Sequence, residues 1–154
     1  MADGRIVAIC ISPAKGEPMR EVRQVRAIEG MGLEGDRYAL GEGSFNQGQI
    51  GRRQVTLING VFFPGSGFEF VDSRRNLVTV GVELMWLIGR EFDVGEARLR
   101  GVKYCDPCKR PSRLLGKTVS FDHVFHDRGG LVAEVVRGGL IRVDDAIVPP
   151  PKGY

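Results

Sequence analysis

The chain has 154 residues, enough for one domain that buries a core without disulfide bridges, so we treat residues 1–154 as a single domain. Its 22 lysines and arginines against 19 aspartates and glutamates give a net charge of +3, and no basic run reaches five residues, which argues against a nucleic-acid partner. The first residues lack a secretory signal pattern and no apolar run approaches the roughly 18 residues of a membrane span, so we expect a cytoplasmic protein without membrane contact.

Glycine and proline divide the chain into short segments. The 22 glycines and eight prolines disfavour long helices and predict a compact, mainly β domain. Apolar and β-branched runs predict strands at 5–12, 21–28, 54–59 and 73–80. Residues 81–89 suit a short, mostly buried helix between two glycines, and 91–99 alternate around a glycine as a bent strand would.

The last third of the chain continues this pattern. Residues 113–117 could form a turn of helix, whereas the alternation in 119–125 indicates a strand. Residues 126–130 form a polar turn. The segments 131–137 and 140–143 are predicted to be two strands joined by a Gly-Gly hairpin.

Two stretches could shape a binding site. Glycines at 30, 32 and 35 allow either a surface turn, which we favour from this stretch alone, or a loop that forms the floor of a pocket. Their spacing does not match the known phosphate-binding fingerprints. Arg74, Arg75 and Asn76 could bind an anion through their planar donor groups, although two solvated surface charges are the simpler interpretation.

Sulfur chemistry is expected at Cys105 and Cys108, which are spaced C-x-x-C. Five basic residues lie close by in the sequence: Lys103, Lys109, Arg110, Arg113 and Lys117. Positive charge favours the thiolate, which is the reactive and metal-binding form of cysteine. Cys10 sits in an apolar run and is predicted to be a core residue.

The residues alone leave several interpretations of this pair open. Cys105, Cys108, His123 and His126 give C-x2-C-x14-H-x2-H, close to a structural zinc site, but the histidine gap is shorter than usual. The segment Cys-Asp-Pro-Cys-Lys is also similar to a thioredoxin-like dithiol, although Pro111 would cut short the long helix that such a motif opens. The two thiols could also be inert.

Six motifs, read in order, carry a family resemblance. They are Gly32–Arg37, Arg53–Ile58, Arg74–Leu84, Leu87–Gly95, Asp127–Val135 and Gly139–Ile147, with the cysteine segment between the fourth and fifth. This order resembles the MOSC domain family, the domain found at the C-terminus of molybdenum cofactor sulfurases and standing alone in many small bacterial proteins. The resemblance implies a closed, bent β-barrel of the MOSC and pyruvate-kinase β-barrel-like type with a few short helices.

The resemblance also implies a site and its chemistry. The family binds molybdenum cofactor or handles sulfur for metal-sulfur centres through a shared cysteine, which Cys108 matches best, as metal ligand or persulfide carrier. Cys105 is the less certain partner, which could release the sulfur by forming a disulfide. The residues expected to bind the cofactor, chiefly its phosphate, are Arg74, Arg75 and Asn76, then Arg37, Arg53 and Arg128, with close backbone approach at Gly129. Asp36 is expected to orient Arg37 by a salt bridge.

The expected partners would supply the activities that this chain lacks. The larger sulfurases carry a pyridoxal-phosphate desulfurase domain for which this chain has no room, so we expect no pyridoxal phosphate here. Sulfur would come from a separate cysteine desulfurase, and a molybdoenzyme is another expected partner. The resemblance leaves open whether the chain is a sulfur transferase or a component of a molybdenum-dependent reductase.

Overall fold

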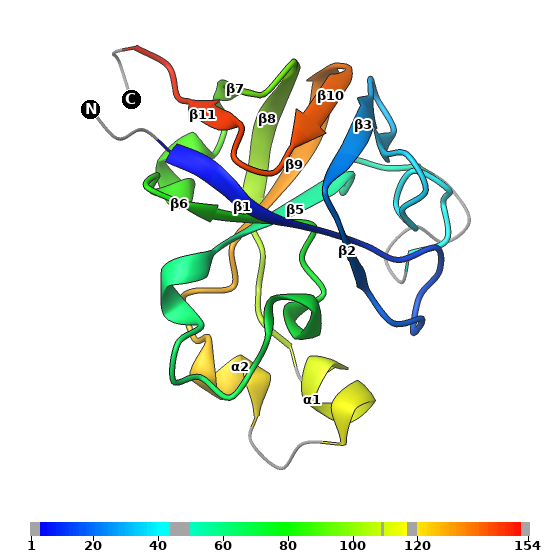
Figure 1. Cartoon of the computed structure of the whole chain (residues 1–154), viewed down its shortest axis with the longest axis vertical. Coiled ribbons are helices and arrows are strands. Elements are labelled where there is room, and N and C mark those ends of the chain that lie inside the picture. Colours follow the sequence, from blue (N-terminus) through cyan, green and yellow to red (C-terminus); the bar gives the residue numbers. More distant parts are fainter. Residues whose placement is uncertain (1–3, 44–49, 109, 117–119, 152–154) are drawn as a thin grey trace.

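One large β-sheet forms most of the molecule (Figure 1). The computed structural model describes residues 4–43, 50–108, 110–116 and 120–151, with Arg110 described by its backbone alone. Within these residues the sheet has eight strands in the order β11-β7-β8-β9-β5-β6-β1-β2. Their bounds are β1 (Gly4–Ile11), β2 (Arg20–Val22), β5 (Val55–Asn59), β6 (Leu77–Val80), β7 (Glu91–Val94), β8 (Ala97–Tyr104), β9 (Leu131–Arg137) and β11 (Ala146–Val148).

The sheet closes on itself to form a barrel. β1 pairs with β11 as well as with β6, so β1, β11, β7, β8, β9, β5 and β6 form a ring, and β2 pairs with β1 beside it. Register shifts in β1 and β8 bend these strands, as β-bulges do. Fully buried side chains such as Ile9, Leu57 and Leu99 belong to the main core cluster. The closed, bent β-barrel expected from the sequence is therefore confirmed.

A smaller sheet corrects two predictions. In the described part of the chain it has three strands: β10 (Gly139–Arg142) pairs with β3 (Gln24–Ile28), and β3 pairs with β4 (Gly32–Leu33). The predicted hairpin is wrong, because β9 pairs with β5 and β8 instead of β10. The chain crosses to the small sheet at Gly138. A Cβ there would lie 2.8 Å from the carbonyl oxygen of Ala27, so this close approach favours glycine. The expected strand at 21–28 likewise divides into β2 and β3, which join different sheets.

Short helices lie at the end of the molecule that Figure 1 shows below the barrel. They include α1 (Arg110–Leu115), η2 (Phe70–Ser73) and α2 (Phe121–Val124). The strand predicted for 119–125 is wrong where it is described, and Val119 lies outside the described residues. Phe121 and Phe125 are four residues apart and stack with their ring centroids 4.6 Å apart, so one turn of helix buries both rings. The turn of helix expected at 113–117 is confirmed for 113–115, which lie in α1, and Lys117 lies outside the described residues.

The middle of the chain was predicted in part. The short helix expected in 81–89 is present as the 3-10 helix η3 (Leu84–Leu87), with Leu84 and Leu87 buried and Trp86 62% exposed. η1 (Gly60–Phe62) is a second 3-10 helix, after β5. The single bent strand expected at 91–99 is instead a hairpin, in which β7 pairs with β8 and Val94 lies opposite Ala97. Gly95 makes this turn possible because its φ of 55° is left-handed.

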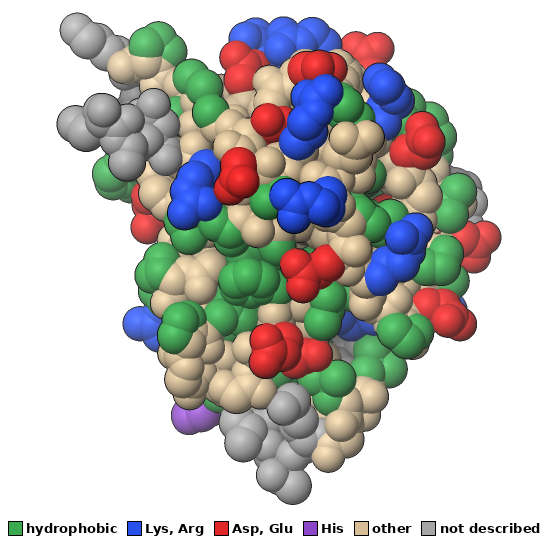
Figure 2. Space-filling model, in the orientation of Figure 1, with side chains coloured by type: hydrophobic (Ala, Val, Ile, Leu, Met, Phe, Trp, Pro, Cys, Tyr) green, Lys and Arg blue, Asp and Glu red, His purple; other side chains and the backbone are tan. Residues whose placement is uncertain are grey.

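Charged side chains of both signs cover the barrel. In Figure 2, basic and acidic side chains alternate over the upper part of the face shown. On β7, β8 and β9, Arg100 contacts Glu91 at 2.6 Å and Glu134 at 3.2 Å, and Arg52 also contacts Glu134 at 3.2 Å. Among the described residues, no helix is both long enough and apolar enough to span a membrane.

Candidate functional site

The two cysteines of the C-x-x-C segment differ sharply in exposure. Cys105, directly after β8, is completely buried, whereas Cys108 is exposed. The segment is held from two sides, because the backbone N–H of Cys105 donates to Gly130 at 2.9 Å and Nη2 of Arg75 donates to the carbonyl oxygen of Asp106 at 3.2 Å. One thiol is thus held inside the protein and the other faces solvent.

Arg53 binds the buried thiol. Its Nη2 donates to Sγ of Cys105 at 3.4 Å, and its Nε donates to Oη of Tyr38 at 3.2 Å. Burial lowers the pKa of Arg53, but the Cys105 sulfur and the Tyr38 hydroxyl raise it by more, so it lies above its usual value. The guanidinium therefore stays charged beside the sulfur.

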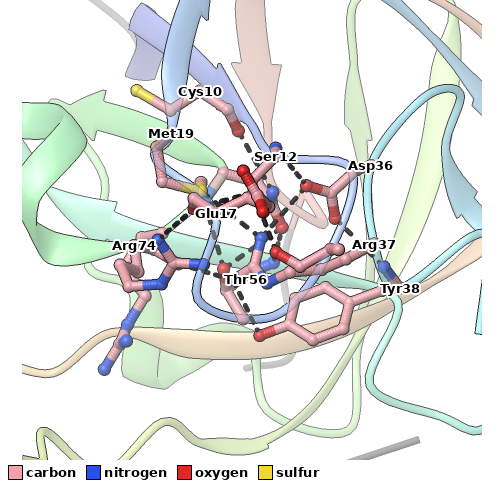
Figure 3. Close-up of polar contacts among 12 residues, drawn as sticks. Cys10, Ser12, Glu17, Met19, Asp36, Arg37, Tyr38, Thr56 and Arg74 are labelled. Atoms are coloured by element: carbon pink, nitrogen blue, oxygen red, sulfur yellow. Dashed lines mark hydrogen bonds and ion pairs between the residues drawn. The ribbon is translucent and has the colours of Figure 1, made fainter. Parts of the chain in front are cut away.

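Tyr38 connects the half-buried Arg53 to Arg37, which is buried. Nη2 of Arg37 donates to Oη of Tyr38 at 3.1 Å and to the carbonyl oxygen of Arg74 at 3.0 Å, and the Arg37 guanidinium lies 4.3 Å from the centre of the Tyr38 ring. Figure 3 shows Arg37 between Asp36 and Tyr38. Gly30 and Gly35 lie in exposed turns, so the surface turn favoured for the glycine-rich stretch is confirmed there. Gly32 and residues 36–38 are buried, and the end of the stretch forms part of the site.

Asp36 orients Arg37. Nη1 of Arg37 lies 3.1 Å from Oδ1 of Asp36, which confirms the expected salt bridge. Asp36 also accepts hydrogen bonds from the backbone N–H groups of Ser12 at 3.0 Å and Tyr38 at 3.3 Å. Burial raises the pKa of Asp36 above its usual value, although Arg37 and these hydrogen bonds act in the opposite direction.

Arg75 is buried and donates to backbone carbonyl groups. Its Nε donates to Gly129 at 2.8 Å, its Nη1 to Ser73 at 3.3 Å and its Nη2 to Asp106 at 3.2 Å. Among the described residues, the buried charged side chains are those of Arg37, Arg75 and Asp36. The carboxylate of Asp36 is paired with Arg37. In the part of the chain that the structure describes, Arg75 is therefore balanced by carbonyl dipoles and the Phe121 ring, 5.9 Å away, instead of a carboxylate, and a negative group nearby would be stabilised.

The sequence match identifies the family of the chain. The MOSC domain family matches residues 63–148. The chain belongs to the MOSC domain family.

Solved structures share the whole MOSC fold seen here. The YUAD protein from Bacillus subtilis aligns with a TM-score of 0.77 at 16% identity, over 95% of this chain and 94% of that one. YiiM from Geobacillus stearothermophilus aligns with a TM-score of 0.70 at 14% identity, over 98% and 77%. YiiM from Escherichia coli aligns with a TM-score of 0.63 at 18% identity, over 97% and 71%. No curated protein matches the chain.

The MOSC barrel does not bring all the predicted site residues together. Asn76 is fully buried, and its Oδ1 accepts hydrogen bonds from the backbone and the hydroxyl of Thr56 at 3.0 and 3.2 Å, so it joins β5 to the start of β6. Nη1 of Arg74 donates to the carbonyl oxygen of Glu17 at 2.7 Å. Arg128 is exposed, with its guanidinium 5.0 Å from the centre of the Phe62 ring, where both line a separate hollow. Cofactor binding by these residues stays a prediction.

The zinc alternative finds no support in this MOSC site. His123 and His126 are exposed, and the nearest charged partner of His126 is Asp127 at 3.5 Å. Over residues 4–43, 50–108, 110–116 and 120–151, no three His, Cys, Asp or Glu residues are grouped so as to hold a metal ion. A thioredoxin-like arrangement is also absent from this part, because α1 begins after Cys108 and has six residues.

Two features of the MOSC site were missed or only partly foreseen. Tyr38 was not predicted to take part, although its position directly after Asp36 and Arg37 could have drawn attention to it. Gly129 was predicted to let the backbone approach a ligand. In the structure the close approach is to the chain itself, because a Cβ on Gly129 would collide with the carbonyl oxygen of Cys105.

Proposed function

We propose that this MOSC protein carries sulfur as a persulfide on Cys108, receives it from a cysteine desulfurase and passes it to a metal-sulfur centre. The observation that carries the proposal is the exposure of Cys108 three residues after the buried Cys105. A carrier thiol must reach the active sites of two other proteins, and an exposed thiol can do so.

A positive charge bound to the backbone of the cysteine segment favours the same role. Arg75 donates to the carbonyl oxygen of Asp106, two residues before Cys108, and its charge is balanced by carbonyl groups. A persulfide on Cys108 is an anion, and a nearby guanidinium stabilises it relative to the protonated form.

Molybdenum cofactor fits the same donor set as the acceptor or ligand. Arg75, Arg37 and Arg53 would supply positive charge for its phosphate, and Cys108 would supply a soft thiolate for its metal. When bound, the cofactor supplies a molybdenum ion that takes sulfur ligands. The residues of this chain hold the anion and present the thiol.

The proposal is tested by sulfur loading. Reduced protein is incubated anaerobically with a cysteine desulfurase and free cysteine, then analysed for cyanide-releasable sulfur and intact mass. Cys105→Ser is expected to retain about one sulfur per chain, and Cys108→Ser none. Equal sulfur on both variants, or none on Cys105→Ser, would contradict a carrier centred on Cys108.

A further inference from the structure

Arg53 donates a hydrogen bond to the Cys105 sulfur from one edge of its guanidinium group. Nε and Nη2 lie on one edge of the guanidinium, the edge that commonly binds the two oxygens of a carboxylate side by side. Here Nε donates to the Tyr38 oxygen at 3.2 Å, and Nη2 donates to the Cys105 sulfur at 3.4 Å. Arg53 thus presents paired charged donors to a phenol and a thiol.

Of these two acceptors, the thiol gives up its proton more readily. Thiols ionise at lower pH than phenols, and a hydrogen bond from a cation is stronger to a thiolate than to a neutral thiol. Tyr38 also accepts a hydrogen bond from Arg37 at 3.1 Å, so its oxygen is shared by two guanidinium groups. Arg53 is therefore placed to stabilise negative charge on the Cys105 sulfur when this sulfur reacts.

Backbone contacts fix Cys105 at the start of the C-x-x-C segment. Cys105 is tied to Gly130 through its N–H at 2.9 Å, and Gly129 packs against the backbone of Cys105 and Pro107. Cys108 follows three residues later in a stretch that is neither helix nor strand. The C-x-x-C spacing is the one at which redox-active proteins form a disulfide within a single segment.

We propose that Arg53 is a positioning residue that holds Cys105 as the thiolate that discharges sulfur from Cys108. This inference rests on the proposed carrier function. The Cys105 thiolate attacks Sγ of the Cys108 persulfide, so that an Sγ–Sγ bond forms between the cysteines as the bond to the outer sulfur breaks. The outer sulfur of the anionic persulfide takes up one proton from solvent and leaves as hydrosulfide, which carries away the negative charge that the Cys105 thiolate loses. A cellular dithiol then reduces the disulfide and is itself oxidised to a disulfide.

The first experiment compares sulfide release after anaerobic loading with a cysteine desulfurase and free cysteine. The variants are wild type, Cys105→Ser, Arg53→Gln and Arg53→Lys, with Arg52→Gln as the matched control. Arg52 is the neighbouring arginine, is exposed and pairs with Glu134 at 3.2 Å on the barrel surface. Sulfide is measured in solution, and the Cys105–Cys108 disulfide by intact mass with and without a dithiol.

Wild type and Arg52→Gln are expected to release sulfide and form the disulfide. Cys105→Ser is expected to keep its sulfur, and Arg53→Gln to release it roughly tenfold more slowly or worse, because the charged hydrogen bond is lost. Arg53→Lys restores a positive charge and should recover part of the rate. Equal release by wild type and Arg53→Gln, or persistent sulfur on wild type, would overturn the inference while leaving the carrier function intact. Failure of Cys105→Ser to take up sulfur would overturn both.

A spectroscopic comparison separates this role from a merely structural one. In Cys108→Ser the ultraviolet absorbance of the Cys105 thiolate is expected to appear at a lower pH than after Arg53→Gln is added, and Cys105→Ser should remove it. Cys10 does not interfere, because burial and the nearby Glu21 raise its pKa to about 12. Unchanged absorbance in the Arg53→Gln double variant would show that Arg53 does not hold a thiolate.

Discussion

Arg75 and Gly129, which are 54 residues apart in sequence, are joined by a 2.8 Å hydrogen bond from Nε of the arginine to the carbonyl oxygen of the glycine. The same guanidinium donates to Asp106 at 3.2 Å, so it links the turn before β9 to the cysteine segment after β8. These two contacts attach a buried positive charge to the backbone of the cysteine segment, two residues before the exposed Cys108.

Replacement of Arg75 should destabilise the protein strongly. Arg75→Ala leaves the carbonyl groups of Ser73, Asp106 and Gly129 without this donor, and we expect the free energy of unfolding to fall by roughly 2–4 kcal/mol. Arg23→Ala, which removes an exposed arginine, should change it by less than about 0.5 kcal/mol. Urea denaturation of both variants checks this, and similar losses for the two would contradict the bridging role of Arg75.

Gly129 should not tolerate even one methyl group. A Cβ there would collide with the carbonyl oxygen of Cys105 and would lie 2.7 Å from Cδ of Pro107. Gly129→Ala is expected to lower the free energy of unfolding by about 2 kcal/mol or more and to reduce sulfur loading of Cys108. Gly51→Ala is the control, because a Cβ at Gly51 meets nothing within 4 Å. Wild-type melting temperature and loading in Gly129→Ala would refute the close contact.

Asp36 should make stability depend on pH in an unusual direction. Because burial raises its folded-state pKa, the folded protein holds this proton to higher pH than the unfolded chain. The contribution of Asp36 to the free energy of unfolding therefore falls as pH rises from the unfolded-state pKa, about 3.9, through the folded-state value.

Asp36→Asn removes this titration. The difference in the free energy of unfolding between wild type and Asp36→Asn, measured by urea denaturation at several pH values, should shift against wild type as pH rises through that interval. A difference that is constant, or that shifts in favour of wild type, would show that Arg37 outweighs burial.

The contribution of Glu134 to the free energy of unfolding should depend on pH in the opposite direction from that of Asp36. Hydrogen bonds from Arg52 lower its pKa, with Arg100 adding to the effect, so its stabilising contribution is present above the unfolded-state pKa and is lost as pH falls through the folded-state value. We expect Glu134→Gln to cost up to about 1 kcal/mol at neutral pH and less at about pH 3.5 or in high salt. Equal cost under all three conditions in urea denaturation would exclude an electrostatic origin.

Much of the fold could be predicted from local sequence. The apolar runs at 5–12, 54–59 and 131–137 form β1, β5 and β9, because a continuous β-branched run can be buried on both faces. The prediction failed at 119–125, where Phe121 and Phe125 fit helical spacing as well as they fit a loose alternation. Strand partners were also missed, since the pairing of β10 with β3 depends on contacts between distant segments.

The sequence by itself determined that this is a mainly β chain of the MOSC type with a C-x-x-C segment rich in nearby positive charge. Those properties follow from residue order and composition. The tertiary structure alone decided that Cys105 is buried and Cys108 exposed, and that Arg53 and Tyr38 meet the buried sulfur. Tyr38, Arg53 and Cys105 come from three separate segments, and only closure of the barrel brings their side chains within hydrogen-bond distance.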